Sequence, residues 1–127
     1  MKINEVEQAV GISKKNIRFY EQEGLLRPSR SANGYRDYAP ADVKTLLQVK
    51  LLRKLDIPLE EIKRIQSGSL TLGDCLQRHL IVLRRRRTNL EATEEFCRRI
   101  LSESAEMTTL PVEQLLADME NMEKGGT

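Results

Sequence analysis

Apolar side chains recur every three or four residues along most of this chain, a spacing that predicts a mainly helical protein. Ile3, Val6 and Val10 form the first of these stripes, and Gly11 interrupts it where the backbone turns easily. Ser13 follows and can cap the start of a second helix through its hydroxyl group. Two short amphipathic helices separated by a glycine turn have the spacing of a helix-turn-helix.

The second helix, which we expect to begin near Lys14, has one apolar side and one charged side. Ile17 and either Tyr20 or Phe19 would turn inward. The remaining positions hold polar and basic side chains, and they gather at the N-terminal end of the helix, where the helix dipole is positive. This outer face consists of Lys14, Lys15, Asn16 and Arg18.

A short β-hairpin is predicted after the second helix. Pro28 cannot continue a helix, and Asn33 followed by Gly34 is a strong signal for a tight hairpin turn. Tyr35 and Tyr38 flank a charged pair in the strand that leaves the turn. The hairpin therefore carries a basic and aromatic edge.

Two more helices should follow the hairpin. Pro40 suits the first turn of one helix, and Pro58 starts the next, which Gly68 would end. In the earlier helix the apolar side chains repeat every fourth residue, and in the later one they form a single stripe. The repeat in the first is Val43, Leu47, Leu51 and Leu55, and the buried stripe in the second is Leu59, Ile62 and Ile65.

A single helix of about 35 residues is predicted from Thr71 onward. Thr71 and Asp74 resemble a capping box, and the apolar residues beyond them fall into a seven-residue column. A helix this long with a narrow apolar seam needs a partner, and the chain has no second helix of comparable length. We therefore expect dimerisation with a second copy through Leu76, Leu80, Leu83, Leu90, Cys97, Ile100 and Leu101.

Charge is distributed unevenly along the chain. The net charge of +2 divides into +4 for residues 1–66, with 13 Lys+Arg against 9 Asp+Glu, and −2 for residues 67–127, with 8 against 10. The N-terminal half is thus the half suited to a polyanion, although the excess is modest and favours two copies acting together. No apolar run is long enough to span a membrane, and the start lacks the order of a signal peptide. We therefore expect a cytoplasmic protein without a membrane partner.

Four segments resemble those of one protein family. INEVEQAVGIS, NIRFYEQEGLL, NGYRDY and LRKLDIPLEEI follow one another across roughly residues 1 to 70. In this order they are similar to the DNA-binding half of a MerR-family transcriptional regulator. The resemblance implies a mainly α protein in which a winged helix-turn-helix domain with a small β-hairpin wing precedes a long dimerisation helix that forms an antiparallel coiled coil. We expect this DNA-binding domain over residues 1–70, the dimerisation helix over 71–107, and a short C-terminal helix and tail over 108–127.

The resemblance also implies roles for individual side chains. Arg18 could contact a guanine edge or a phosphate, and Asn16 could read a base. The lysines and the wing arginines would neutralise phosphates, and the tyrosine hydroxyls would donate to phosphate oxygens. The predicted DNA-binding residues are Lys14, Lys15, Asn16, Arg18, Tyr20, Arg30, Tyr35, Arg36 and Tyr38. Two alternatives stay open at this point: Tyr20 could belong to the core, and Arg36 could pair with Asp37 or Glu21.

A MerR-like regulator would bind a pseudo-palindromic promoter as a homodimer and distort its spacer to control RNA polymerase. A small-molecule effector is a further expected partner, whose identity the sequence does not give. The alternative is a helical coiled-coil adaptor that acts through protein contacts without specific DNA binding. The hairpin beside the basic helix favours the regulator, because an adaptor has no evident use for it.

Metal binding and catalysis find less support in the sequence. Cys75 and His79 lie four residues apart, as metal ligands on a helix can, but the segment SESAEMTTLP offers only Met107 to complete a site. We therefore expect neither a metal nor a cofactor, with Cys75 in apolar surroundings and His79 on the helix surface. An enzyme is not expected, because His79 is the only histidine and there is no phosphate-binding glycine loop. We expect the run from Arg84 to Arg87 to cover the partner helix and meet Glu91, Glu94 or Glu95 of either copy.

Overall fold

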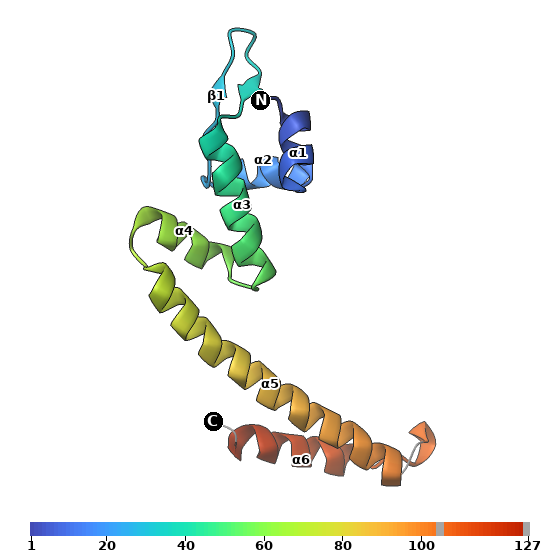
Figure 1. Ribbon diagram of the computed structural model, residues 1–127. Coiled ribbons are helices and arrows are strands. Elements are labelled where there is room, and N and C mark those ends of the chain that lie inside the picture. Colours follow the sequence, from blue (N-terminus) through green and yellow to red (C-terminus); the bar gives the residue numbers. More distant parts are fainter. Residues whose placement is uncertain (104–105, 126–127) are drawn as a thin grey trace. The chain divides into compact units, whose positions relative to one another are not determined.

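A computed structural model describes residues 1–103 and 106–125 as a mainly helical chain with one small hairpin (Figure 1). It has two compact units, Met1–His79 and Leu80–Thr127, which are described separately below. The predicted fold class, mainly α with a two-stranded wing and a long C-terminal helix, is confirmed. Within the described ranges, no helix combines the length and the apolar character that crossing a membrane requires.

The first unit begins with two short helices and a hairpin, and further helices follow. Gly11 ends the first helix in the left-handed conformation, with φ 67°, and its N–H donates to the Glu7 carbonyl at 2.9 Å. Gly68 ends α4 in the same way, as predicted. The elements are α1 (Ile3–Val10), α2 (Lys14–Gln22), β1 (Ser29–Arg30), β2 (Arg36–Asp37), α3 (Pro40–Lys54), α4 (Leu59–Ser67) and the first turns of α5 (Leu72–Glu103).

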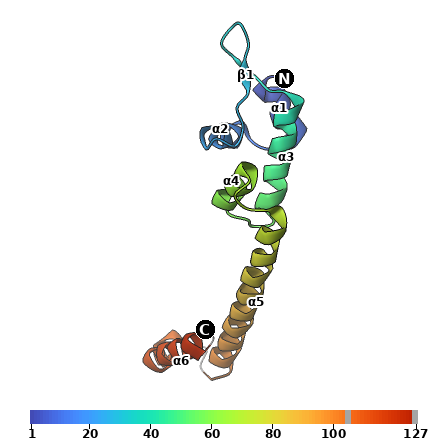
Figure 2. The same cartoon turned by 90° about the vertical axis from the view of Figure 1, so that its left-hand side faces the viewer.

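The core of the first unit collects one side of each helix. Val6 from α1, Ile17 from α2, Leu46 from α3 and Ile62 from α4 are each at least 98% buried and belong to a single cluster. Burial of a side chain of this size stabilises the fold by about 1.5–3 kcal/mol. Figure 2 shows α4 beside the C-terminal part of α3. Leu59 and Ile65, which were predicted to share the buried stripe of Ile62, pack against the same cluster.

The four-residue repeat that predicted α3 does not mark its buried side. Leu47, Leu51 and Leu55 are exposed, Leu51 by 60%, whereas Leu46 and Val49 are almost fully buried. A strict four-residue repeat drifts by about 40° per step around a helix of 3.6 residues per turn, so it cannot stay on one face. Because α3 carries leucines on both faces, periodicity alone does not determine which face the other helices cover.

The start of α5 is fastened to the corner between α3 and α4. The prediction that His79 lies on the helix surface is wrong, because its side chain is buried and its Nε2–H donates to the Leu55 carbonyl. Cys75 is buried as expected, and its Sγ lies 3.5 Å from Glu61 Oε2. Burial, assisted by the Glu61 carboxylate, raises the pKa of the Cys75 thiol. At this corner Asp56 has a left-handed backbone, with φ 65°.

The second unit consists of the rest of α5, a 3-10 turn and α6. Helix α6 folds back along α5 (Figures 1 and 2) and is tied to it by an ion pair of 2.6 Å between Arg99 Nη2 and Asp118 Oδ2. Leu115 is buried at this contact, and Phe96 is half-buried. Within the described residues, helix α5 runs over Leu72–Glu103. The turn is Met107–Thr109, α6 is Val112–Gly125, and residues 104–105 and 126–127 lie outside the described residues.

Substitutions at two neighbouring positions of α3 test which of its faces is buried. Leu46→Ala should lower the free energy of unfolding by about 2–5 kcal/mol, because it leaves a cavity in the core. Leu47→Ala, at a position 46% exposed, should cost less than about 1 kcal/mol. Urea denaturation followed by circular dichroism measures both, and a greater loss from Leu47→Ala would contradict the described packing.

Candidate nucleic-acid interface

Helix α2 begins with its backbone donors satisfied by side chains. The Ser13 hydroxyl accepts from the Asn16 N–H at 3.2 Å, which is the predicted cap, and Glu7 Oε2 accepts from the Lys14 N–H at 2.9 Å. The Glu7 contact links the start of α2 to α1. These two bonds fix the direction in which the N-terminal end of α2 projects, and with it the positive end of the helix dipole.

The outer face of α2 is basic and polar, as predicted. Lys15, Asn16 and Arg18 are exposed, and Lys14 is half-buried beside α1. Of the two aromatic residues, Tyr20 turns inward against the core, while Phe19 is 43% exposed. Phe19 is therefore a candidate contact that the sequence did not identify, since the apolar spacing allowed either ring to face inward.

The wing is a two-stranded antiparallel hairpin that pairs Ser29 with Asp37 and Arg30 with Arg36. Its turn is closed by a hydrogen bond of 2.9 Å from the Gly34 N–H to the Ser31 carbonyl. The Arg30 side chain is exposed and donates through Nη1 to the Gly34 carbonyl at 3.0 Å. Tyr35, in the loop of this hairpin, is 70% exposed. Both predicted contacts in this part of the wing are thus accessible.

An ion pair joins the wing to α2. Arg36 Nε on β2 lies 2.6 Å from Glu21 Oε2 on α2, and the carboxylate side chain is only 19% exposed. The hydrogen bond and charge of Glu21 raise the pKa of the Arg36 guanidinium. This is one of the two alternative partners considered for Arg36. The pair holds the hairpin beside the helix, although the two residues are 15 positions apart in the chain.

Tyr38 is a core residue. Its side chain is 1% exposed, so the prediction that its hydroxyl donates to a DNA phosphate is wrong. Its Oη has no hydrogen-bond partner among the described residues. Burial, followed by the nearby Glu21 charge, raises the pKa of Tyr38. Side chains alternate between two sides here: Asp37 is exposed, and Tyr38, directly after β2, faces the core. The backbone N–H of Tyr38 donates to the Met1 carbonyl at 2.8 Å.

The other predicted residues do not belong to this interface. Cys75 and His79 are buried at the base of α5, and no group of three His, Cys, Asp or Glu side chains in residues 1–103 and 106–125 is placed to hold a metal ion. Of the predicted dimerisation residues, Leu76 packs against the core of its own unit and Ile100 is half-buried. The others, Leu80, Leu83, Leu90, Cys97 and Leu101, are exposed.

Comparison with known proteins agrees with this geometry. Residues 1–69 match the family model of MerR HTH family regulatory proteins. The chain is 38% identical over 102 residues to the HTH-type transcriptional regulator CueR of Escherichia coli O157:H7, covering 79% of this chain and 70% of CueR. For other curated relatives, among them the HTH-type transcriptional regulator HmrR of Rhizobium leguminosarum bv. viciae, the match spans half or less of their length.

Two solved structures share the fold. The transcription regulator PbrR691 of Ralstonia metallidurans CH34, in complex with lead(II), matches with a TM-score of 0.73 and 25% identity, over 91% of this chain and 98% of that one. HiNmlR, a MerR family regulator that lacks the sensor domain and is bound to promoter DNA, matches with a TM-score of 0.52 and 24% identity, over 80% of this chain and 78% of that one. The family match covers the helix-turn-helix and the wing together. The chain therefore belongs to the MerR family of helix-turn-helix regulatory proteins.

Proposed function

We propose that this protein is a transcriptional regulator that binds a pseudo-palindromic promoter as a homodimer. The observation that carries the proposal is the exposed row of Lys15, Asn16 and Arg18 at the start of α2, held beside an exposed wing by the Glu21–Arg36 pair. Family membership supports it, as does the promoter DNA bound by HiNmlR. The adaptor alternative gives neither the basic face of α2 nor the wing a role.

Helix α2 is suited to the major groove. Its N-terminal end would face the DNA, where Lys14 and Lys15 neutralise phosphates and Asn16 and Arg18 reach base edges. Arg18 can donate two parallel hydrogen bonds to one guanine through its planar guanidinium group. The exposed ring of Phe19 offers an apolar contact for a thymine methyl group. Tyr20 is half-buried against the core, so its contact with the DNA phosphate backbone would be peripheral.

The wing would reach the neighbouring phosphate backbone. Arg30 and Tyr35 are accessible there, and they supply positive charge and a hydroxyl donor without reading sequence. Arg36 has a double role in this proposal. Its Nε is engaged by Glu21, while the rest of the guanidinium can still donate to a phosphate because the side chain is 36% exposed.

Two copies would place two α2 helices on successive half-sites of the promoter. Distortion of the DNA between the half-sites would then set the promoter elements in register for RNA polymerase, in the cytoplasm where promoter DNA resides. The cost of such distortion depends on the DNA sequence between the contacts, so it adds specificity at positions that the protein does not touch. A small-molecule effector that shifts this distortion would make the protein a switch.

The contact by Arg18 is tested by Arg18→Ala. We expect the affinity for a labelled duplex from upstream of the coding sequence to fall about 10- to 100-fold, because an exposed hydrogen-bonding cation is lost. Fluorescence anisotropy titrations between about 50 and 200 mM salt measure the affinity and its salt dependence.

Lys54→Ala is the matched control for Arg18→Ala. Lys54 is exposed at the C-terminal end of α3, and its loss changes the net charge equally without touching α2 or the wing. We expect at most a small effect from it. Equal losses of DNA affinity in the two variants would show that binding depends only on net charge. They would contradict the assignment of α2 as the recognition helix.

The assignment of Tyr38 to the core is tested by Tyr38→Phe. Removal of a buried hydroxyl without a partner should leave stability unchanged or raise it by about 1 kcal/mol, and DNA affinity should stay the same. Because burial raises the pKa of the Tyr38 phenol, the folded state disfavours the ionised form, so the free energy of unfolding is unaffected below pH about 10 and falls as the pH rises further. The variant should therefore lose less stability in alkali, as measured by urea denaturation across this range. A loss of DNA affinity would restore the hydroxyl as a DNA contact.

The ion pair between the wing and α2 is tested by a double-mutant cycle of Glu21→Gln and Arg36→Gln. The expected coupling in the free energy of unfolding is about 0.5–1 kcal/mol at low salt, since Arg36 is partly exposed and solvent screens the pair. The coupling should shrink as salt is added. Zero coupling at low salt would show that the two side chains do not hold the wing in solution.

A further inference from the structure

Glu21 is an acidic residue between the two elements that are proposed to meet DNA. It lies on α2, the helix that carries Asn16 and Arg18, and its side chain contacts the wing through Arg36 at 2.6 Å. A carboxylate in this place repels a polyanion and so lowers the affinity for any DNA. The contacts of Glu21 show what offsets this cost.

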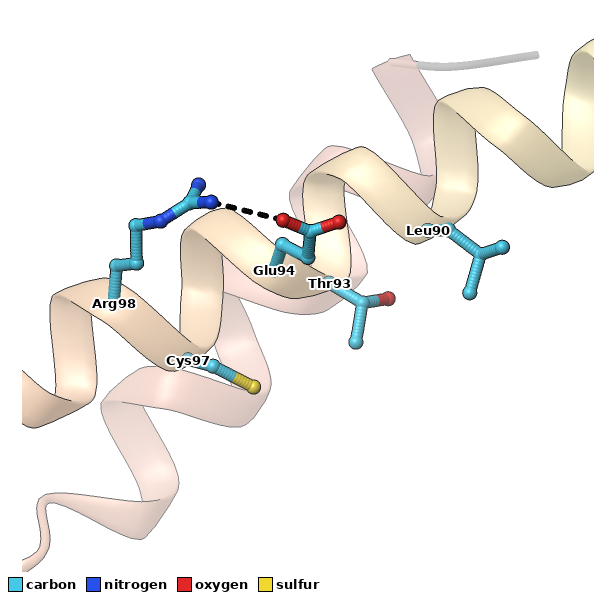
Figure 3. A pocket seen from close by; sticks show the side chains of 5 residues that line it. All are labelled: Leu90, Thr93, Glu94, Cys97 and Arg98. Carbon is cyan, nitrogen blue, oxygen red and sulfur yellow. Dashed lines mark hydrogen bonds and ion pairs between the residues drawn. The ribbon is translucent and has the colours of Figure 1, made fainter.

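The Glu21–Arg36 pair differs from an ion pair on a helix surface. Figure 3 shows a pair of that ordinary kind, between Arg98 and Glu94 of α5, whose side chains are 66% and 63% exposed. Solvent screens such a pair and leaves both side chains free to rearrange. Glu21 and Arg36 are less exposed, they belong to different elements, and their contacting atoms Oε2 and Nε are buried. Their pair therefore restrains the wing relative to α2.

The contact between Arg36 and Glu21 is made at the inner end of the guanidinium group. Because Nε is buried, the exposed part of the Arg36 side chain belongs to its other atoms. Nη1 and Nη2 lie beyond Nε, and they can donate to a phosphate oxygen. Since Glu21 holds Nε, the direction of these donors is set by the position of α2.

The neighbours of Arg36 in the wing cannot replace Glu21. The Asp37 carboxylate accepts from the amino group of Met1 at 2.8 Å. Arg30 lies directly opposite Arg36 in the hairpin, on the same face of the two strands, where like charges repel each other. Without the charge of Glu21, the two arginines would move apart, and the outer end of Arg36 would lose its fixed direction.

We propose that Glu21 is a positioning residue that gives DNA binding part of its sequence specificity. It joins the phosphate contact of Arg36 to the docking of α2, so that both form together where Asn16 and Arg18 meet a matching base sequence. On other DNA, an arginine held by Glu21 cannot turn toward the nearest phosphate, and the carboxylate repels the backbone. The inference rests on the DNA binding of the proposed function and adds a source of discrimination to it.

Loss of the Glu21 charge has two opposite effects on DNA affinity. Removal of a negative charge raises the affinity for every duplex by a similar factor. Release of Arg36 means that its side chain must be ordered when the protein binds a matched sequence, which lowers that affinity by about two- to tenfold. On a random sequence the released arginine gains phosphate contacts instead. The ratio of the two affinities therefore separates positioning from net charge.

Glu21→Gln tests the proposal in the full chain. The wild-type chain first selects a duplex from a library of random sequences, and an unselected random-sequence duplex of equal length serves for comparison. Fluorescence anisotropy at about 100 mM salt measures the dissociation constants for both. We expect the ratio of the two affinities to fall about tenfold, while the affinity for the unselected duplex rises about two- to threefold. An unchanged ratio would show that Glu21 acts through charge alone and would overturn the proposal.

Two further variants separate position from charge. Arg36→Lys keeps the positive charge but lacks the planar fork, so it should lower the ratio as Glu21→Gln does. This variant carries the test if circular dichroism shows that Glu21→Gln does not fold, and an unchanged ratio in it overturns the proposal. Glu60→Gln is the matched control, because Glu60 is exposed on α4, outside α2 and the wing. It changes the net charge equally and should leave the ratio unchanged.

The double variant of Glu21→Gln with Arg36→Gln shows whether Glu21 acts through Arg36. If it does, the ratio in the double variant should lie within about threefold of the ratio in Arg36→Gln alone. Reductions that multiply would mean that the two side chains contribute independently, and they would overturn the positioning role.

The outcomes also separate this inference from the proposed function. A wild-type chain that enriches no duplex from the library contradicts the regulator, and the role of Glu21 fails with it. Enrichment by the wild-type chain together with an unchanged ratio in Glu21→Gln overturns the role of Glu21 alone.

Discussion

Burial of Leu46 and Val49 on α3 is the constraint on which the DNA-facing elements depend. Helices α1, α2 and α4 have 8, 9 and 9 residues, lengths at which an isolated helix is marginal in water. They persist because each contributes one or two apolar side chains to a cluster organised along the 15-residue α3. The recognition face of α2 is therefore held in place from behind, by residues that cannot touch DNA.

Local signals in the sequence predicted the elements well. Gly11 and Gly68 end helices in the left-handed conformation, Ser13 caps α2, and Asn33-Gly34 forms the hairpin turn. Each of these depends on a few neighbouring residues, so the chain carries the information locally. The basic outer face of α2 was predictable for the same reason, because its positions are set by helical spacing once Ile17 is placed inside.

What failed depended on packing between distant segments. The choice between Leu46 and Leu47 is made by the helices that cover α3, and Tyr38 is buried because the segment after β2 lies against the core rather than in the open wing. The Glu21–Arg36 pair was one of two alternatives, and only the folded backbone selects between them. His79 looked like a surface residue because the helix periodicity gives no sign that the Leu55 carbonyl lies within its reach.

The hydrogen bond between His79 and Leu55 restrains rotation at the base of α5. The His79 imidazole donates to the carbonyl of Leu55, just after α3. Rotation of α5 about its axis would lengthen and misalign this hydrogen bond, so the bond opposes such rotation. Cys75, one turn earlier, is held in apolar surroundings beside Glu61 and adds a second point of attachment. The adjoining corner also holds Asp56 in the left-handed backbone region, with φ 65°, which residues other than glycine rarely adopt.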